Sequence, residues 1–175
     1  MAEREVLEMD DNLSDTGHCI SEKMSSGRYV GEICLYALRT AAKEGVFYDK
    51  GREFVEGLKF LDTPTADKWG SGKLPKGIYG EDAVNLVYII NEIFERAARC
   101  IACVLCAILM LTGDGTEKPV CIAADGSLYK KSRLFKPMLE DCMAIYAEEI
   151  MERKFVFVTA DEATVIGTAA GALLN

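Results

Sequence analysis

The sequence predicts an α/β fold that is rich in helices and carries a short β-sheet near the C-terminus. Apolar residues recur at steps of three or four along most of the chain, which indicates amphipathic helices. Two short apolar runs, at 119–124 and 154–159, have the length of strands, and a helical pattern lies between them. Because a two-stranded sheet is marginal in water, we expect these strands to belong to a larger sheet.

The length and composition fit one globular domain or one lobe of a larger protein. The chain has 175 residues, of which 50% are hydrophobic and 27% charged, and this excludes a disordered or collagen-like protein. We divide the chain into an acidic N-terminal arm at 1–17 and a single domain at 18–175.

The net charge is −8, from 20 basic and 28 acidic residues. A chain of this charge repels a phosphate backbone, so we expect no nucleic-acid partner. A nucleotide is still compatible with it, because the backbone amides of a helix N-terminus hold phosphate without any net positive charge.

Two helices are expected in the first third of the chain. Residues 20–46 have apolar or small side chains at helical spacing, and Gly45 ends this helix. A shorter helix follows at 50–58. The segment 61–80 is rich in Thr, Pro, Gly and Lys and is expected to be an irregular connection.

A long helix is expected at 81–111, with acidic residues in its first turn. Its last part, 100–111, is apolar throughout but too short to span a bilayer, so we expect a buried core helix and no membrane partner. The N-terminus carries no secretory signal and the seven cysteines are an odd number, so we expect a cytoplasmic protein with reduced thiols.

The C-terminal part is expected to alternate strands and helices. A buried strand at 119–124 precedes a helix at 133–152, and a second strand follows at 154–159. A helix of small residues then runs to Leu174.

Two glycines, Gly27 and Gly31, fall inside the expected helix at 20–46. Each glycine costs a helix about 1 kcal/mol relative to alanine, so each needs a reason. One reason is close packing through a face of small residues. The other is a surface kept bare so that a ligand can approach.

The segment 124–130 follows directly after an expected strand, where ligands bind in open α/β sheets. Gly126 allows close approach of the backbone and Ser127 offers a hydroxyl group. The alternative is an ordinary tight turn, which Asp-Gly favours.

Other polar and thiol groups give weaker signals. Cys100, Cys103 and Cys106 lack the further ligands of a zinc site and are expected to be small core residues. His18 has no nucleophile motif beside it and is expected at the surface. Three aspartates are interpreted as a solvated acidic face: Asp10, Asp11 and Asp15.

Four motifs then occur in a characteristic order. NLSDTG at 12–17 with EKMSSGRYVGEI at 22–33, ERAA at 95–98, ADGSLYK at 124–130 and GTAA at 167–170 together resemble the hexokinase and glucokinase family. The resemblance covers the chain from about Asp10 onward and matches the C-terminal part of the family's large lobe. It implies an actin-like, ribonuclease-H-like ATPase fold. It also implies transfer of the γ-phosphoryl group of Mg-ATP to the 6-hydroxyl of a hexose, a reaction of glycolysis.

The resemblance assigns a sugar contact and a nucleotide contact in the first motif. Glu22 matches the acid that accepts hydrogen bonds from sugar hydroxyls, a role that suits a carboxylate because it is acceptor-only. Gly27 and Arg28 match a pair at the nucleotide site, where the planar guanidinium group meets phosphate.

Four more residues are assigned to nucleotide binding by the same resemblance. Thr63 matches a threonine near the nucleotide, and Asp67 stands where a serine is usual. Gly126 and Ser127 match the Asp-Gly-Ser turn that contacts the nucleotide. ATP with Mg is the implied cofactor, and we expect no metal bound by the protein itself.

The chain also departs from the family. Cys19 stands where a glutamine near the sugar is frequent, and residues 163–165, Ala-Thr-Val, replace a glycine-containing stretch near the nucleotide. The family's phosphate-binding strand, its small-lobe sugar loop and the segment with the catalytic aspartate have no match here. This chain alone is therefore expected to be inactive, with no catalytic residue of its own.

Three functions follow from these observations. The first is a hexokinase-like protein that phosphorylates a hexose once the missing N-terminal half completes it. The second is a non-catalytic sugar- or nucleotide-binding module derived from the same fold. The third is an interaction protein that self-associates through the surface a missing half would cover.

Overall fold

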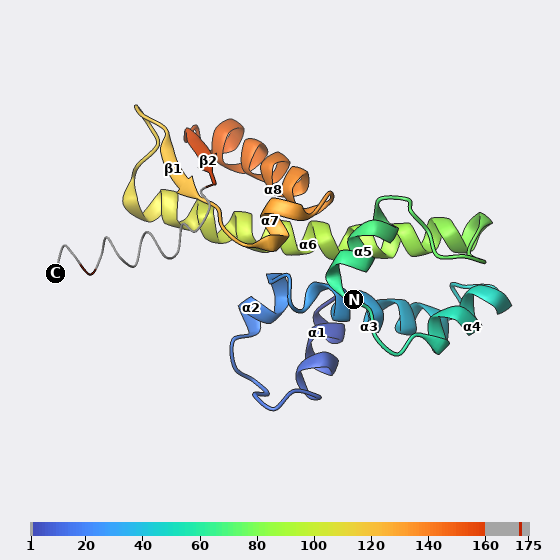
Figure 1. Ribbon diagram of the computed structural model, residues 1–175. Helices are drawn as coiled ribbons and strands as arrows, with labels where there is room; N and C mark the ends of the chain where they lie inside the picture. The colour runs from blue at the N-terminus through green and yellow to red at the C-terminus, as the bar shows by residue number, and fades with distance from the viewer. Residues whose placement is uncertain (1, 160–171, 173–175) are drawn as a thin grey trace.

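A computed structural model describes residues 2–159 and residue 172. Figure 1 shows a helix-rich molecule with a small sheet close to the C-terminal end. The described elements are α1 (Ala2–Asp10), α2 (Ile20–Ser25), α3 (Val30–Lys43), α4 (Asp49–Gly57), α5 (Thr63–Gly70), α6 (Gly80–Thr112), β1 (Val120–Ala123), α7 (Ser127–Lys131), α8 (Phe135–Met143), the π-helix η1 (Ala144–Ile150) and β2 (Phe155–Val158).

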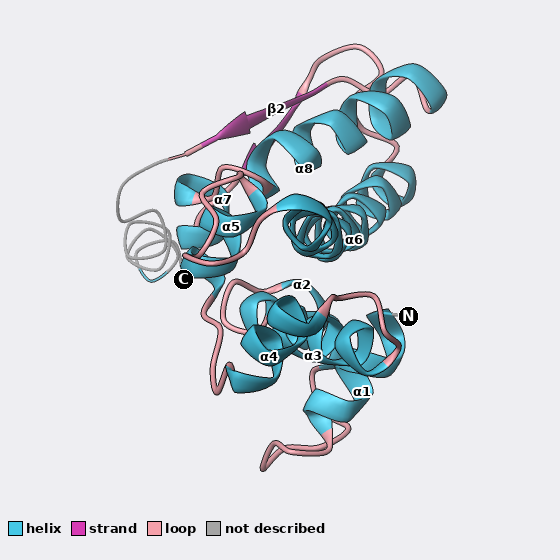
Figure 2. Cartoon of the chain, turned by 90° about the vertical axis from the view of Figure 1, so that its right-hand side faces the viewer, coloured by secondary structure: helices cyan, strands magenta, loops and turns pink. Residues whose placement is uncertain are grey.

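Helix α6 is the centre of the fold. It has 33 residues and is about 50 Å long. In Figure 2 it lies between helices α1 to α4 on one side and α8 with the sheet on the other. Its buried residues Leu86, Ile90 and Phe94 join the two halves of one core. The helix expected at 81–111 is confirmed.

The single helix expected at 20–46 is wrong, because it is divided into α2 and α3. Ser26 interrupts it with an extended backbone, at φ −84° and ψ 147°. Gly31, in the first turn of α3, lies so close to α5 that a Cβ atom would come 2.3 Å from the backbone nitrogen of Thr63. Close packing is therefore the reason for Gly31. Gly45, at φ 81°, follows the end of α3 as expected.

The irregular connection expected at 61–80 is also wrong, since it contains α5. The side chain of Asp62 caps this helix by accepting a hydrogen bond from the backbone N–H of Thr65 at 2.7 Å. Pro64 follows in the first turn, a position that proline favours. The shorter helix expected at 50–58 is confirmed as α4.

The two strands form a parallel pair. Val120 lies beside Phe155 and Ala123 beside Val158. The expectation of a buried first strand is wrong, because Cys121 and Ala123 are exposed on the outer face. The helix expected at 133–152 begins at Phe135 and becomes π-helical in η1. The small-residue helix expected up to Leu174 lies outside the described residues, apart from residue 172.

The N-terminal residues form α1, which packs against α3 through Val6 and Met9. The expectation that Asp10 belongs to a solvated acidic face is wrong. Asp10 is 3% exposed, and its Oδ1 atom lies 2.5 Å from the Nζ atom of the buried Lys23. Asp11 is exposed, as expected. Asp15 is exposed too, but its carboxylate also pairs with Lys23 at 3.1 Å.

The apolar run at 100–111 is buried along one face only. Ala102, Cys106 and Leu109 face the core, whereas Ile108 and Leu111 are exposed. Within the described part of the chain, none of the helices has the length and apolar character needed to cross a bilayer.

The seven cysteines are free thiols, and they differ in accessibility. Cys34 is buried, and its burial raises the pKa of the thiol far above the ordinary value. Cys19, Cys103 and Cys121 are exposed.

Candidate functional site

Two adjoining pockets bring the predicted nucleotide residues together. We call the first the basic pocket. It has a volume of about 310 Å³ and is lined by Gly27, Thr63, Asp67 and Ser127, together with four cationic side chains described below. These predicted residues come from segments up to 100 positions apart (127 − 27) in the sequence. The fold therefore gathers four of the six predicted nucleotide residues in one cavity.

Thr63 is buried at the start of α5, where its side chain joins α5 to α3. Its Oγ1 atom accepts a hydrogen bond from the backbone N–H of Gly31 at 2.9 Å. The close approach at Gly31 and this hydrogen bond fix the wall of the basic pocket. Thr63 thus has a structural role in the pocket wall, and its contact with a nucleotide stays a prediction.

Asp67 is nearly buried and organises the segment that leads into α8. Its Oδ1 atom accepts hydrogen bonds from the hydroxyl of Ser132 and from the backbone N–H groups of Arg133 and Leu134, the last two at 2.9 and 3.1 Å. Because a carboxylate repels phosphate, we interpret Asp67 as a residue that positions the pocket wall.

Four cationic side chains line the basic pocket and were not found from the sequence. Lys68 and Lys73 come from the end of α5 and the loop after it, and Lys131 and Arg133 from the end of α7 and the loop that follows. All four are exposed, and none is ion-paired with another described residue. In a chain of net charge −8, this concentration of positive charge attracts an anion.

The second pocket, of about 420 Å³, shares Gly27 and Ser127 with the first and adds Arg28 and Gly126. The guanidinium group of Arg28 lies over the ring of Tyr29, with 5.2 Å between Cζ and the ring centre. Arg28 is exposed, so its nitrogens are accessible to a ligand. The six predicted nucleotide residues therefore border one continuous region.

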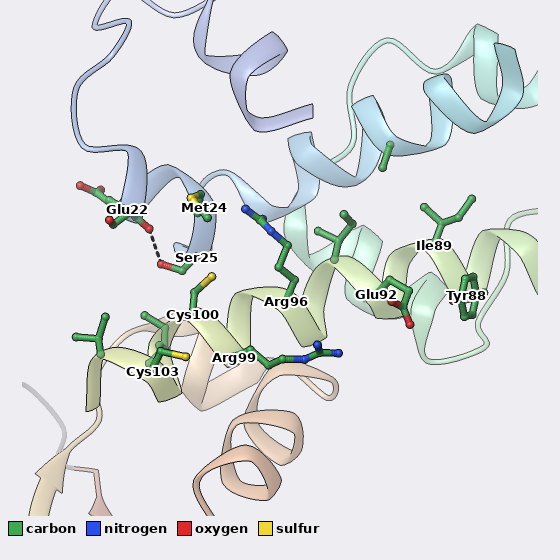
Figure 3. Close-up of a pocket in the computed structure, with 15 residues that line it drawn as sticks. Glu22, Met24, Ser25, Tyr88, Ile89, Glu92, Arg96, Arg99, Cys100 and Cys103 are labelled. Atoms are coloured by element: carbon green, nitrogen blue, oxygen red, sulfur yellow. Dashed lines mark hydrogen bonds between the residues drawn. The ribbon is translucent and has the colours of Figure 1, made fainter. Parts of the chain in front are cut away.

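Glu22 lies apart from the nucleotide residues. It is exposed on α2 at one end of a larger cavity, of about 960 Å³, which we call the α6 groove. Figure 3 shows this groove between α2 and α6, with Glu22 on one wall and Arg96 on the other. The structure does not bring Glu22 into either nucleotide pocket.

Comparison with known proteins identifies the family of this chain. The sequence model of the family described as hexokinase matches residues 7–174. The chain belongs to the hexokinase family. The actin-like fold expected from the motif order is confirmed by this match and by the structural similarity below.

Hexokinase relatives match the chain over part of their length. Hexokinase-1 of Nicotiana tabacum is 28% identical over 189 aligned positions, which cover 95% of this chain and 38% of the relative. Hexokinase-1 of Homo sapiens is 29% identical over 140 positions, covering 70% of this chain and 15% of that protein. The chain thus spans well under half of the length of these hexokinases.

A solved hexokinase has the same fold in the matched region. The hexokinase from Schistosoma mansoni, solved as a complex with glucose, has a TM-score of 0.66 and 18% identity. The similarity covers 89% of this chain and 38% of that hexokinase chain.

Proposed function

We propose that this chain supplies part of the nucleotide site and one sugar contact of a hexokinase. The complete protein would transfer the γ-phosphoryl group of Mg-ATP to the 6-hydroxyl of a hexose, with the N-terminal half of the fold supplied by further polypeptide. The observation that supports this most strongly is the basic pocket, where predicted nucleotide residues meet four cations.

The residues of the basic pocket fit a nucleotide phosphate. Lys68, Lys73, Lys131 and Arg133 are donors of the kind that bind phosphate oxygens. Gly27 packs closely against Leu128 in the pocket wall, since a Cβ atom there would lie 3.1 Å from the Cβ of Leu128. When bound, the Mg ion of Mg-ATP would neutralise charge on the phosphates.

Glu22 would bind the sugar rather than activate it. Its carboxylate lies on the exposed face of α2, where it can accept hydrogen bonds from two hydroxyl groups. Each of the two pockets is lined by one carboxyl group, and both groups are engaged by neighbours: Asp67 accepts hydrogen bonds from backbone N–H groups, and Asp125 pairs with Lys130 at 2.7 Å. We therefore assign the chain a binding role and leave proton transfer to the missing half.

A thermal-shift titration of the purified chain with Mg-ATP and Mg-ADP tests the nucleotide site. A ligand at 100 times its dissociation constant stabilises the folded state by about 2.7 kcal/mol, which raises the unfolding temperature. We expect Ser127→Ala and Lys131→Gln to reduce this shift. The matched control is Lys43→Gln, which removes an exposed lysine outside both pockets.

The same titration also separates the candidate functions. A nucleotide shift that persists in Lys131→Gln and Ser127→Ala would contradict the basic pocket as its source. A shift with either nucleotide, together with hexose-dependent ADP production once the missing half is restored, supports the kinase. Binding without turnover in the restored protein would identify a non-catalytic module.

A further inference from the structure

The basic pocket holds its positive charges close together. The backbone N–H of Lys73 donates a hydrogen bond to the carbonyl oxygen of Lys68 at 3.0 Å, which closes the turn after α5. Asp67, the residue before Lys68, accepts a hydrogen bond from the backbone N–H of Arg133 at 2.9 Å. Three of the four cations therefore start from backbone segments that hydrogen bonds tie to one another, and Lys131 lies two residues before Arg133.

This arrangement gathers like charges without compensation. The described lining of the pocket sets four cations against a single carboxylate, that of Asp67. The described residues provide none of the four cations with an ion-pair partner. Like charges that the backbone holds together repel one another and destabilise the compact state. A ligand with several negative charges would offset this repulsion.

The basic pocket lacks the groups that usually bind a nucleobase. Its described lining contains no aromatic ring, on which a base stacks, and no asparagine or glutamine amide, which pairs with the edge of a base. Its volume of about 310 Å³ is at the lower end for ligand pockets. The pocket therefore suits a row of phosphate groups better than a whole nucleotide.

The aromatic rings that line the adjoining pocket are already engaged. The buried ring of Tyr129 packs against Phe157, with 5.3 Å between the ring centres, and the Nζ atom of Lys136 lies 5.4 Å from the centre of the same ring. Phe157 also packs against Phe155, again with 5.3 Å between the ring centres. The third ring, Phe135, is buried. Among the described residues, neither pocket thus offers a free ring face to a base.

We propose that the basic pocket recognises a chain of phosphate groups and not a nucleobase, and that linear inorganic polyphosphate is therefore a ligand of this chain. This inference rests on the proposed function in one respect, because both assign phosphate binding to the basic pocket. Each linked phosphate adds a negative charge and oxygen atoms that accept hydrogen bonds from lysine and arginine. Polyphosphate shares this chemistry with the triphosphate of ATP, and the two differ in the base.

The first test compares ligands by calorimetric titration of the purified chain. Inorganic tripolyphosphate, ATP and GTP are used as their magnesium salts. We expect their dissociation constants to agree within about five-fold, because the phosphate chain that they share makes the contacts. A larger difference between any two of them would overturn the proposal. Adenosine, which carries no phosphate, should not bind, and binding of adenosine would equally overturn it.

The second test removes charges from the pocket. The double variant Lys131→Gln with Arg133→Gln should weaken tripolyphosphate and ATP alike, by about ten-fold. The matched control is Lys43→Gln with Lys50→Gln, which removes two exposed lysines outside the basic pocket and the same total charge. Equal affinity in the two double variants would overturn the proposal, since binding would then follow the net charge of the chain.

The pocket variant also has a readout without any ligand. At low ionic strength, loss of two mutually repelling charges should raise its unfolding temperature, and 0.5 M NaCl, about an order of magnitude above low-salt buffer, should remove this rise by screening. An unfolding temperature below that of the unchanged chain would overturn the proposal, because it would mean that these side chains are already paired.

The choice of ligands separates this inference from the proposed function. Binding of ATP without tripolyphosphate would reject the inference and keep the nucleotide site. Binding of tripolyphosphate without ATP would reject the nucleotide site and keep the polyphosphate site, and binding of neither would reject both. Sulfate, a single-centred anion, should bind at least about ten-fold more weakly than tripolyphosphate. Equal binding of sulfate would overturn the inference, because the pocket would then attract any anion.

Discussion

Lys23 is fully buried, and two aspartates hold its ammonium group. Its hydrogen bond with Asp10 and that between Asp10 and the backbone N–H of Gly17 hold the pKa of the Asp10 carboxyl below its ordinary value. Burial opposes the charge on Lys23, but the hydrogen bonds and charges of Asp10 and Asp15 outweigh it and raise the pKa of Lys23. Both groups are therefore charged in the folded state at neutral pH.

This ion pair predicts a pH dependence. Because the folded-state pKa of Asp10 is lowered, its contribution to stability is present above about pH 4 and is lost as the pH falls through the folded value. We expect Asp10→Asn to lower the unfolding temperature by several degrees at pH 7, with the difference disappearing in strong acid. Thermal unfolding from pH 2 to pH 8 measures it. Asp11→Asn, at an exposed site, should match the unchanged protein throughout.

Single residues were predictable from the sequence only where their role is local. Gly45 is predicted correctly as a helix stop, whereas the equally local cap by Asp62 is hidden among polar neighbours, so a local role does not always suffice. Asp10 was misread because its partner, Lys23, is on another helix. The cations of the basic pocket were missed because they come from two distant segments.

The contact between α3 and α5 predicts the effect of a methyl group. Gly31→Ala would place Cβ 2.3 Å from the nitrogen of Thr63 and 2.6 Å from the carbonyl oxygen of Leu61, and backbone atoms cannot move aside cheaply. We expect a loss of about 2–4 kcal/mol in the free energy of unfolding, measured by urea denaturation. Gly57→Ala is the control, because it meets nothing within 4 Å and should be neutral or slightly stabilising. A Gly31→Ala protein of unchanged stability would show that this contact is looser than described.

Elements were predictable where their apolar pattern is continuous. Helix α6 begins and ends within a residue of the expected bounds, since its periodicity runs unbroken from Gly80 to Thr112. The boundary between α2 and α3 was missed, because the same periodicity continues across it. The close contact with α5 explains why residue 31 is a glycine, and the extended backbone at Ser26 separates α2 from α3. The spacing of apolar residues indicates neither the contact at Gly31 nor the break at Ser26.

At the scale of the whole molecule, the described residues expose several large apolar side chains. At the C-terminal end of α6, Met110 is 67% and Leu111 87% exposed, and the two-stranded sheet leaves Val156 and Val158 partly uncovered. The described sheet has two strands, and the expectation that it belongs to a larger sheet stays a prediction. The sequence does not indicate which faces of the helices and strands are exposed, because this depends on which side of α6 is buried.

This surface predicts self-association of the isolated chain. We expect the sedimentation coefficient to rise with protein concentration, and Leu111→Lys to reduce that rise without lowering the unfolding temperature. Leu109→Lys is the contrast, because Leu109 is 2% exposed and a buried lysine should destabilise the fold. A concentration-independent coefficient for the unchanged chain would rule out association through this end.

The cysteine thiols differ in accessibility, so their rates of chemical labelling report on which surfaces of the chain are covered. An alkylating reagent should label Cys19, Cys103 and Cys121 rapidly, whereas Cys34 should react only through global unfolding. Cys103 lines the α6 groove, while Cys121 lies on the outer face of β1. Mass spectrometry of labelled peptides would therefore record occupancy of the groove as protection of Cys103 relative to Cys121, with no engineered probe.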